Sequence, residues 1–488
     1  MVPAVGSAPK EATVRNFQRA TVTLVAVAAA TMGAWTSVGS ASVTPQNGSA
    51  AAPPQGIAAS DIVLAGRGAR QPGADAHSAN LQLVGRSPKR NTVGSDQAFW
   101  GNLAYEGNYN GFRIIDIKDP SHPRVVSDVD CRGPQNDVTV WGHLLFLSVD
   151  RPQTTNSCDN SSDVAIDPKD PSTWTGFEGI RIMDVSNPRD PVFVKSVETD
   201  CGSHTATLVP DLKNGRVLLY VSSYPLIPGP HCGPGKEAAG RHGKISVVAV
   251  PLAAPQRARV VSTPRVNPPV FRLGDPYFPA VGCHDISVFL PLKIAAAACM
   301  TEGQLWDISD PAHPRTLTGL RLRNRNFGFW HSASFTYDGK VVIFGDETED
   351  FPCGAPSSRH GRLWFYRVSD GKQLGSFTIP RAQPGQYCSA HEFTVIPVKD
   401  RYLLTSSWYE GGTTVVDFTN PARAREIAFY DARQPLSSDA WSSYWYNGRI
   451  YVNDIGRGLD VLRLNDPATR TARHFPYLNS ATQTVLIR

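Results

Sequence analysis

The sequence predicts an all-β protein, a seven-bladed β-propeller with four-stranded antiparallel blades. Three observations predict this fold. A strand–turn–strand unit recurs seven times, a pair of strands joined by a tight turn precedes each copy, and the 488 residues include 41 Gly and 39 Pro. Frequent Gly and Pro favour turns over long helices, and a repeated four-strand unit is typical of propellers. A β-sandwich is the alternative, but it would not need the same corner in every unit.

The N-terminal residues have the layout of a secretory signal peptide. Basic residues precede an apolar run over residues 20–35, and the small residues Gly39-Ser40-Ala41 follow it. We therefore expect residues 1–41 to be a signal peptide and the protein to be secreted or to lie in the cell envelope. A retained membrane anchor is the alternative, although the run is short for a spanning helix. After cleavage we expect no stable membrane span.

Residues 42–80 are rich in Ala, Pro, Gly and Ser, and we expect them to form a disordered linker. The propeller is expected to comprise residues 81–488. Its first segment, from Leu81, resembles the fourth strand of a repeat unit. This segment could pair with the last blade and close the ring, which would remove an aggregation-prone edge strand.

The recurring unit is an apolar strand ending in Asp, a turn that contains Pro, and a second strand. Clear copies begin at Gly111, Gly179, Gly303 and Gly411 or Gly412, and weaker ones at Lys244, Gly361 and Gly458. Hairpin turns such as Asp338-Gly339 and Asn447-Gly448 precede them, with residues that accept positive φ. The innermost strands are then expected to begin near Ser95, Asn136, His204, His284, His331, His391 and Trp441.

These units resemble those of the secreted LVIVD-repeat proteins, for which a propeller is predicted. The resemblance covers roughly residues 81–464. It implies the fold but no particular activity, because that family has no single established one. A weaker likeness, based on architecture and channel histidines, is to copper-dependent propellers of the selenium-binding and methanethiol oxidase type.

Eight cysteines in an exported chain indicate disulfides. In a propeller, the loop that enters the innermost strand and the loop that leaves the second strand lie on the same face. We therefore expect bonds between neighbours in sequence. The expected pairs are Cys131–Cys158, Cys201–Cys232, Cys283–Cys299 and Cys353–Cys388, the last of which crosses between blades.

Four of the 12 histidines share one position in the repeat, at the start of the innermost strand. They are His204, His284, His331 and His391. Innermost strands line the channel of a propeller, so these side chains can converge at one mouth. Imidazoles bind copper, zinc, iron and nickel well. We predict a transition-metal site, with copper as the first choice and zinc as the second, because copper binds most strongly and suits an oxidising compartment.

Acidic residues are expected to surround the same mouth. At the ends of the second strands lie Glu106, Asp150, Glu302, Asp346, Glu347, Glu410 and Asp454. Asp285 and Glu392 directly follow two of the histidines. We expect Glu392, Asp285 or Glu347 to orient a ligand or to move a proton as catalytic residues of a metal-dependent oxidoreductase. An acidic rim would also favour cations at this face.

Two alternatives to a metalloenzyme stay open. The histidines could be structural, as in WD-type propellers, and Trp306-Asp307 resembles a unit of that type. The chain could instead be a non-catalytic propeller that binds a protein, a peptide or a glycan at the same mouth. Aromatic residues that would suit such binding are Trp330, Trp408, Trp441 and Tyr444.

The sequence also argues against several classes of protein. The formal net charge is only +5 and the basic residues are scattered, so nucleic acid is not an expected partner. The expected partner is a small molecule, or a protein or glycan, at the channel mouth. No GxSxG, HExxH or phosphate-loop motif is present, so nothing favours a hydrolase, a zincin or a nucleotide-binding protein.

Overall fold

Within the described residues, the regular elements are β-strands and short 3-10 helices, and no α-helix occurs. The computed structural model describes residues 76–89, 91–167, 169–223, 229–232, 242–266, 282–326, 328–348, 361–381, 388–433 and 436–488. These residues all belong to one compact unit, Pro54–Arg488. No helix in these ranges has the length and apolar character that a membrane crossing requires.

Three of the sheets have four antiparallel strands each, in sequence order. The first contains β7 (Gln135–Trp141), β8 (Leu144–Gln153), β9 (Phe177–Asp184) and β10 (Val192–Glu198). The second contains β11 (Thr205–Asp211), β12 (Arg216–Ser222), β13 (Ser246–Pro251) and β14 (Arg259–Ser262). The third contains β19 (Trp330–Phe335), β20 (Val341–Asp346), β21 (Leu363–Arg367) and β22 (Gln373–Phe377).

A nine-stranded sheet contains two further runs of four antiparallel strands. One run is β23 (Glu392–Ile396), β24 (Leu403–Ser407), β25 (Thr413–Asp417) and β26 (Arg425–Asp431). The other is β27 (Ala440–Tyr446), β28 (Arg449–Asp454), β29 (Gly458–Leu464) and β2 (Leu81–Pro88). The two runs meet where β23 and β27 pair in parallel at Glu392 and Phe393.

A ten-stranded sheet likewise contains two runs. One is β3 (Gly94–Trp100), β4 (Leu103–Asn108), β5 (Gly111–Asp116) and β6 (Arg124–Asp130). The other is β15 (Ile286–Phe289), β16 (Ile294–Cys299), β17 (Glu302–Asp307) and β18 (Arg315–Leu322). Two short strands, described below, connect the runs. The fold is therefore all-β with four-stranded antiparallel units, as a propeller has.

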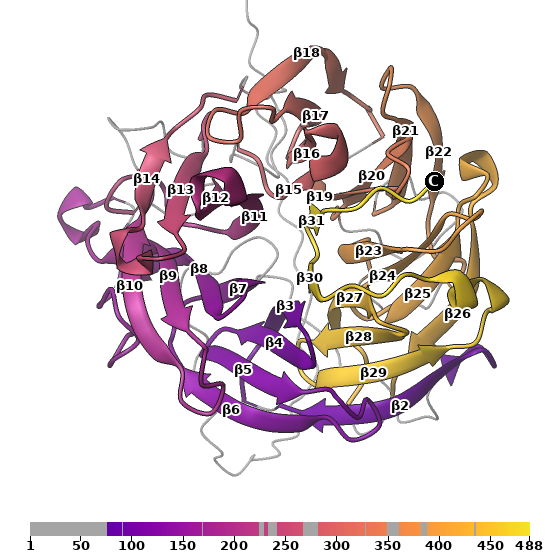
Figure 1. Ribbon diagram of the computed structural model, residues 1–488, viewed down its shortest axis with the longest axis horizontal. Coiled ribbons are helices and arrows are strands. Elements are labelled where there is room, and N and C mark those ends of the chain that lie inside the picture. The colour runs from indigo at the N-terminus through magenta and orange to yellow at the C-terminus, as the bar shows by residue number, and fades with distance from the viewer. Residues whose placement is uncertain are drawn as a thin grey trace, which may run out of the picture. The chain divides into compact units, whose positions relative to one another are not determined.

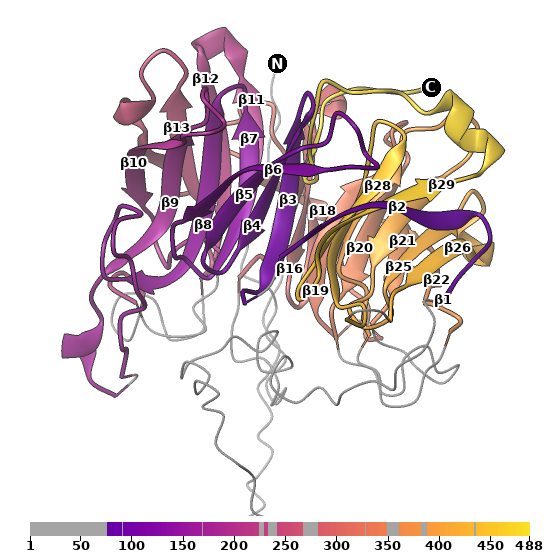
Figure 2. The same ribbon diagram turned by 90° about the horizontal axis from the view of Figure 1, so that it is seen from below.

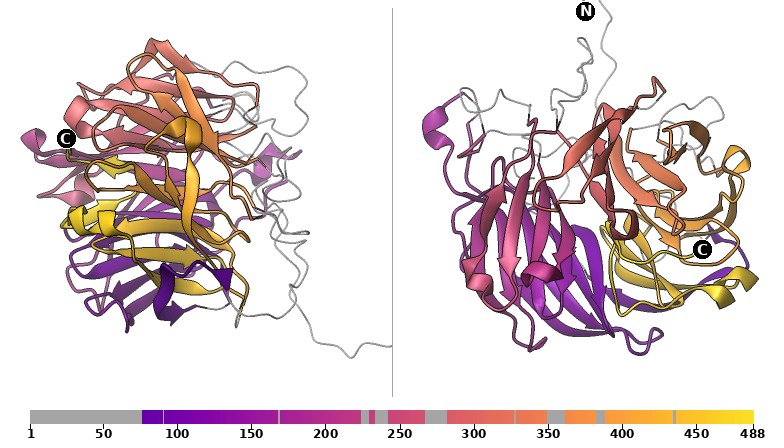
Figure 3. Two further views of the ribbon diagram at one scale, coloured as in Figure 1. Left: turned by 90° about the vertical axis from the view of Figure 1, so that its right-hand side faces the viewer. Right: turned by 45° about the horizontal axis from the view of Figure 1, so that its top comes forward.

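Figure 1 shows these runs side by side around a centre, with the first strand of each run innermost. The strands β3, β7, β11, β15, β19, β23 and β27 face the centre. Each begins within a few residues of the position expected from the sequence. Figure 3 shows the same runs from two other sides.

The N-terminal strand β2 completes the run that begins with β27. Leu81 pairs with Leu464, and Pro88 pairs with Gly458. The expected pairing of the segment from Leu81 with the last repeat is thus found. A shorter strand, β1 (Ala76–His77), pairs with β26. Strand pairing therefore begins inside the range 42–80, which we had expected to be linker throughout.

The recurring Asp closes the turn between the third and fourth strands of a run. Asp116 accepts the backbone N–H of Lys118 at 2.9 Å, and Asp184 and Asp307 each accept an N–H two residues on at 2.8 Å. Such side-chain contacts favour a turn over continued strand. The Gly that opens the unit is required as well: Gly111 has φ 155°, and a Cβ there would meet the carbonyl oxygen of Val129.

Apolar side chains of neighbouring runs pack against each other to form the core. One cluster joins Leu218 and Val247 of one run to Ala295 and Trp306 of the next, and all four are buried. A second cluster joins Ile182 to Leu219 in the same way. The apolar residues of successive repeats therefore hold neighbouring sheets together.

The C-terminal segment crosses the centre between two runs. Strand β30 (Tyr477–Asn479) pairs with β3, and β31 (Thr482–Gln483) pairs in parallel with β15. Figure 2 shows this yellow segment beside β3. Side chains fasten it: Gln483 donates to the carbonyl of Phe335 at 2.7 Å and accepts the N–H of the same residue at 2.9 Å. No pattern in the sequence predicts this crossing.

Three predicted disulfides are confirmed: Cys131–Cys158, Cys201–Cys232 and Cys283–Cys299. Cys388 is also disulfide-bonded. Its predicted partner, Cys353, lies outside the described residues.

Candidate metal centre

The four histidines of the shared repeat position lie at the inner ends of four consecutive runs. His204 and His391 directly precede β11 and β23, His284 lies just before β15, and His331 is in β19. All four side chains face the centre and are buried, with 1–3% of each residue exposed. The common position in the repeat therefore brings them to a common place, as expected.

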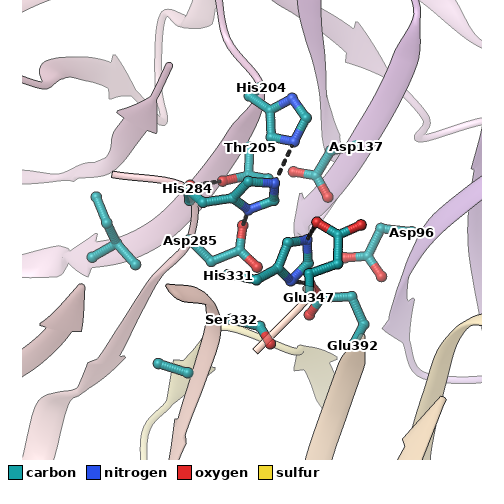
Figure 4. Close-up of polar contacts among 12 residues, drawn as sticks. Asp96, Asp137, His204, Thr205, His284, Asp285, His331, Ser332, Glu347 and Glu392 are labelled. Carbon is teal, nitrogen blue, oxygen red and sulfur yellow. Dashed lines mark hydrogen bonds and ion pairs between the residues drawn. The ribbon is translucent and has the colours of Figure 1, made fainter. Parts of the chain in front are cut away.

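The imidazoles form a row of neighbours. Nε2 of His204 lies 2.8 Å from Nε2 of His284. The ring centroids of His284 and His331 are 3.8 Å apart, and those of His331 and His391 are 4.5 Å apart. Figure 4 shows the first three rings in sequence, with the carboxylates of Asp285, Glu347 and Glu392 beside them. The four side chains converge as a row rather than on a single point.

Two groups of side chains in this row have donor atoms close enough to hold a metal ion. The first is His284, Asp285 and His331, and the second is His331, His391 and Glu392. Within each group the donor atoms lie within 4.8 Å of one another. His204 belongs to neither group, although it contacts His284. The role of these residues as ligands stays a prediction.

Two carboxylates, one from strand β8 and one from the residue that follows His284, contact the histidines and orient them. Asp150 Oδ2 lies 3.0 Å from Nδ1 of His204, and Asp285 Oδ1 lies 3.1 Å from Nδ1 of His284. Such contacts fix the orientation of the rings.

His331 lies between two carboxylates. Its Nε2 is 3.3 Å from Oε2 of Glu347, and its Nδ1 is 3.5 Å from Oε1 of Glu392. His391 differs, because its Nδ1 lies 2.5 Å from the backbone carbonyl of Trp441. The hydroxyl of Tyr409 donates to Oε1 of Glu347 at 2.6 Å, so Glu347 joins this tyrosine to the histidine row.

Burial favours the neutral form of two of these imidazoles, His284 and His331. Burial and then the neighbouring His204 lower the pKa of His284 well below its usual value, and burial and then His284 do the same for His331. A neutral imidazole has the lone pair that a metal needs. Conversely, burial and then the nearby Asp285 raise the pKa of Glu392 well above its usual range.

Two further carboxyl groups belong to this region and were not among the candidates. Burial raises the pKa of Asp96 to about 6, and it also raises that of Asp137, which hydrogen-bonds to Asp96. The Tyr444 hydroxyl donates to Asp96 at 2.5 Å. Both residues occupy the position directly after the histidine position, which holds Asp285 and Glu392 in other repeats. That shared position was the signal that could have revealed them.

These side chains line one cavity at the centre. Its lining includes all four histidines, the four carboxyl groups Asp96, Asp137, Asp285 and Glu392, and the C-terminal residues 479–482. Among the described residues that line it, none is Lys or Arg. Its volume is about 40 Å³. This is room for an ion and a few water molecules rather than for a large organic ligand.

The other acids at the ends of second strands are less available than we expected. Glu106 accepts from Arg113 at 2.7 Å, and Glu302 accepts from Arg321 at 2.7 Å. Asp346 accepts the backbone N–H of Phe329 at 2.9 Å. Of this set, Asp150 and Glu347 contact the histidines. The expected acidic rim is therefore partly neutralised by arginines.

The aromatic residues considered for a binding face are buried. Trp330 and Tyr444 are 0% exposed, Trp408 is 1% exposed and Trp441 is 6% exposed. Trp330 packs edge-on against Phe344 within its own run. None of them offers an exposed face to a protein or a glycan.

Comparison with known proteins finds the LVIVD repeat over residues 95–131 and 176–199. These segments span β3–β6 and the strands β9 and β10. No curated protein matches the chain.

Solved structures resemble it distantly. A proposed 6-phosphogluconolactonase from Bacteroides uniformis ATCC 8492 has 10% identity and a TM-score of 0.49, over 80% of this chain and 97% of that one. Another from Bacteroides fragilis NCTC 9343 has 9% identity and a TM-score of 0.47, over 83% and 98%. The designed protein Ika8 has 10% identity and a TM-score of 0.41, over 80% and 100%. The chain therefore carries matches to the LVIVD repeat within two of its four-stranded runs.

Proposed function

We propose that the chain is an exported seven-bladed propeller that binds a divalent transition metal in its central cavity and uses it in oxidoreductase chemistry on a small molecule. The observation that carries this is the row of four buried imidazoles with carboxylate oxygens beside them. The row contains two groups of donor atoms, and within each group these atoms lie within 4.8 Å of one another. The seven four-stranded runs are the proposed blades, and three disulfides support export to an oxidising compartment.

The donor set favours a divalent ion. It consists of imidazole nitrogens and carboxylate oxygens, and neither Cys nor Met is among the described lining residues. Thiolates and thioethers select Cu(I), whereas imidazole with carboxylate suits Cu(II), zinc or iron(II). Copper(II) is our first choice because it binds most strongly among these ions, and zinc is the second.

Different residues would bind the metal, orient its ligands and move a proton. His284, His331 and His391 would supply nitrogens, and His204 would complete the row. Asp150 and Glu347 would hold two of the rings in place. A bound copper ion would supply one-electron chemistry, and three protein ligands would leave a position for a substrate. Glu392 would orient a ligand or move a proton next to that position, because burial raises the pKa of its carboxyl above the usual range.

Metal analysis tests this proposal. The full chain, made without a His tag and with its disulfides intact, should retain copper or zinc after exhaustive dialysis. The His284→Ala variant should retain less metal than the wild type and should remain folded, as circular dichroism would show. A matched control is His313→Ala, because His313 lies in an exposed turn, where its ring hydrogen-bonds to Asp310. It should keep the metal. A folded wild-type protein that binds no metal would overturn the proposal, and loss of folding in His284→Ala alone would favour a structural role.

A further inference from the structure

The histidine row contains two ligand groups rather than one. His284 and Asp285 lie on one side of His331, and His391 and Glu392 lie on the other. His331 belongs to both groups, and an imidazole has two nitrogens that can each bind a metal. The two groups are adjacent, because the carboxyls of Asp285 and Glu392 hydrogen-bond to each other.

Nδ1 of His331 is available to bind an ion. The residue is 2% exposed, and among the described residues its Nδ1 has no hydrogen-bond partner. The nearest carboxylate oxygen, Oε1 of Glu392, lies at 3.5 Å. A buried polar atom without a hydrogen bond raises the free energy of the folded protein. An ion, a water molecule or a proton next to Nδ1 would remove this penalty.

The charge of the cavity points to more than one cation. Four carboxyl groups line it, and the described lining residues include no Lys or Arg to balance them. Asp96 and Asp137 hydrogen-bond to each other, as Asp285 and Glu392 do. Divalent ions at the two ligand groups would displace the proton that Asp285 and Glu392 share, and each of these carboxylates would then face one cation. Buried unbalanced charge is strongly unfavourable.

We propose that the cavity holds a dinuclear centre, with one divalent ion at His284 and Asp285, a second at His391 and Glu392, and His331 between them. This inference rests on the metal site proposed above and specifies its nuclearity. It also assigns Asp285 and Glu392 as ligands of different ions. Adjacent metal ions can activate both partners of a reaction on a small substrate.

Metal stoichiometry tests the inference. Protein freed of metal with a chelator is titrated with Cu²⁺ and, separately, with Zn²⁺, and the bound metal per chain is measured by mass spectrometry. We expect two ions in the wild type. The conservative variants Asp285→Asn and Glu392→Gln should each bind one, and the double variant none. The matched control is Asp310→Asn, which alters another imidazole–carboxylate contact, the exposed pair of His313 with Asp310 at 2.9 Å. It should still bind two.

Electron paramagnetic resonance of the copper-loaded protein tests the adjacency. Neighbouring Cu²⁺ ions couple, so the signal should account for far less copper than is bound, and Glu392→Gln should restore a signal equal to its copper content. One ion per wild-type chain would overturn the dinuclear centre and leave the proposed function standing. Two ions with a full signal would also overturn it, because the ions would then be far apart. No bound metal at all would overturn both proposals.

Discussion

Nδ1 of His204 lies 3.0 Å from Oδ2 of Asp150, and the two residues come from neighbouring four-stranded runs. The contact holds the His204 ring so that its Nε2 faces His284. Asp150→Asn removes the charge that favours this orientation but keeps the size of the side chain. Through His204, Asp150 helps to orient the proposed ligand His284, and we therefore expect metal affinity to fall about 10–100-fold, as for other residues that orient metal ligands. Isothermal titration with Cu²⁺ would measure this change.

A matched control distinguishes orientation from general damage. Asp184→Asn replaces a partly exposed Asp that accepts the N–H of Ser186 in a turn. It should leave the metal affinity unchanged. If Asp150→Asn lowers stability while metal affinity stays at the wild-type value, Asp150 supports the fold and not the site.

The location of the histidines could be predicted from the sequence because equivalent positions of the repeat lie at equivalent positions in each four-stranded run. The Asp at the end of the third strand and the Gly before it fix the length of each unit, as Asp116 and Gly111 illustrate. The residue that lies at the inner end of a run can therefore be identified from its distance in the sequence to that turn. This is why His204, His284, His331 and His391 were found without a local ligand motif.

Contacts between distant residues could not be predicted in the same way. The strand β31 has two residues and pairs with β15, so it carries no alternation of apolar and polar residues to reveal it. The arginines that neutralise Glu106 and Glu302 lie on adjacent strands, and the sequence does not say which way their side chains point. Asp96 and Asp137 follow Ser95 and Asn136 rather than a histidine, so the histidine pattern alone does not reveal them.

The disulfide Cys283–Cys299 holds the chain next to a proposed ligand, since Cys283 directly precedes His284. Replacing both cysteines by Ser should weaken metal binding, because the backbone at His284 is no longer tied to β16. A cross-link of this loop length contributes roughly 3 kcal/mol to folding. Metal titration and urea unfolding would measure both effects.

The disulfide Cys131–Cys158 provides the control. Its replacement by two Ser residues should also lower stability, but it should leave metal affinity unchanged, because no proposed ligand adjoins Cys131 in the sequence. Equal loss of metal affinity in both double variants would contradict a specific role for Cys283–Cys299.

Asn479 fastens the C-terminal segment to β7. Its Oδ1 accepts from Thr139 Oγ1 and from the N–H of Val140, both at 2.8 Å, and its Nδ2 donates to the carbonyl of Val140 at 2.9 Å. Asn479→Ala leaves these buried groups without partners, and we expect a loss of about 2–4 kcal/mol in the free energy of unfolding. Asn465→Ala, at an exposed position, should change it by less than about 0.5 kcal/mol. Equal values in urea unfolding would show that the segment does not stabilise the fold.

Glu178 should make stability depend on pH. It is 3% exposed, and among the described residues its Oε1 has no hydrogen-bond partner. Burial, followed by the charges of Asp150 and Glu198, raises its pKa from 4.5 to about 8. Between these two values the folded protein holds a proton that the unfolded chain has released. The stabilisation is therefore complete below pH 4.5 and is lost as the pH rises through about 8.

Glu178→Gln stays neutral at every pH and should remove this dependence. We expect the wild-type free energy of unfolding to fall by several kcal/mol, on the order of the pKa shift, between about pH 5 and about pH 8.5. The variant should fall less over the same range and should be the more stable protein above about pH 8, because it buries no charge there. Urea unfolding at a series of pH values would measure both slopes. Parallel slopes for the two proteins would mean that Glu178 is already ionised in the fold, paired with a cation or accessible to water.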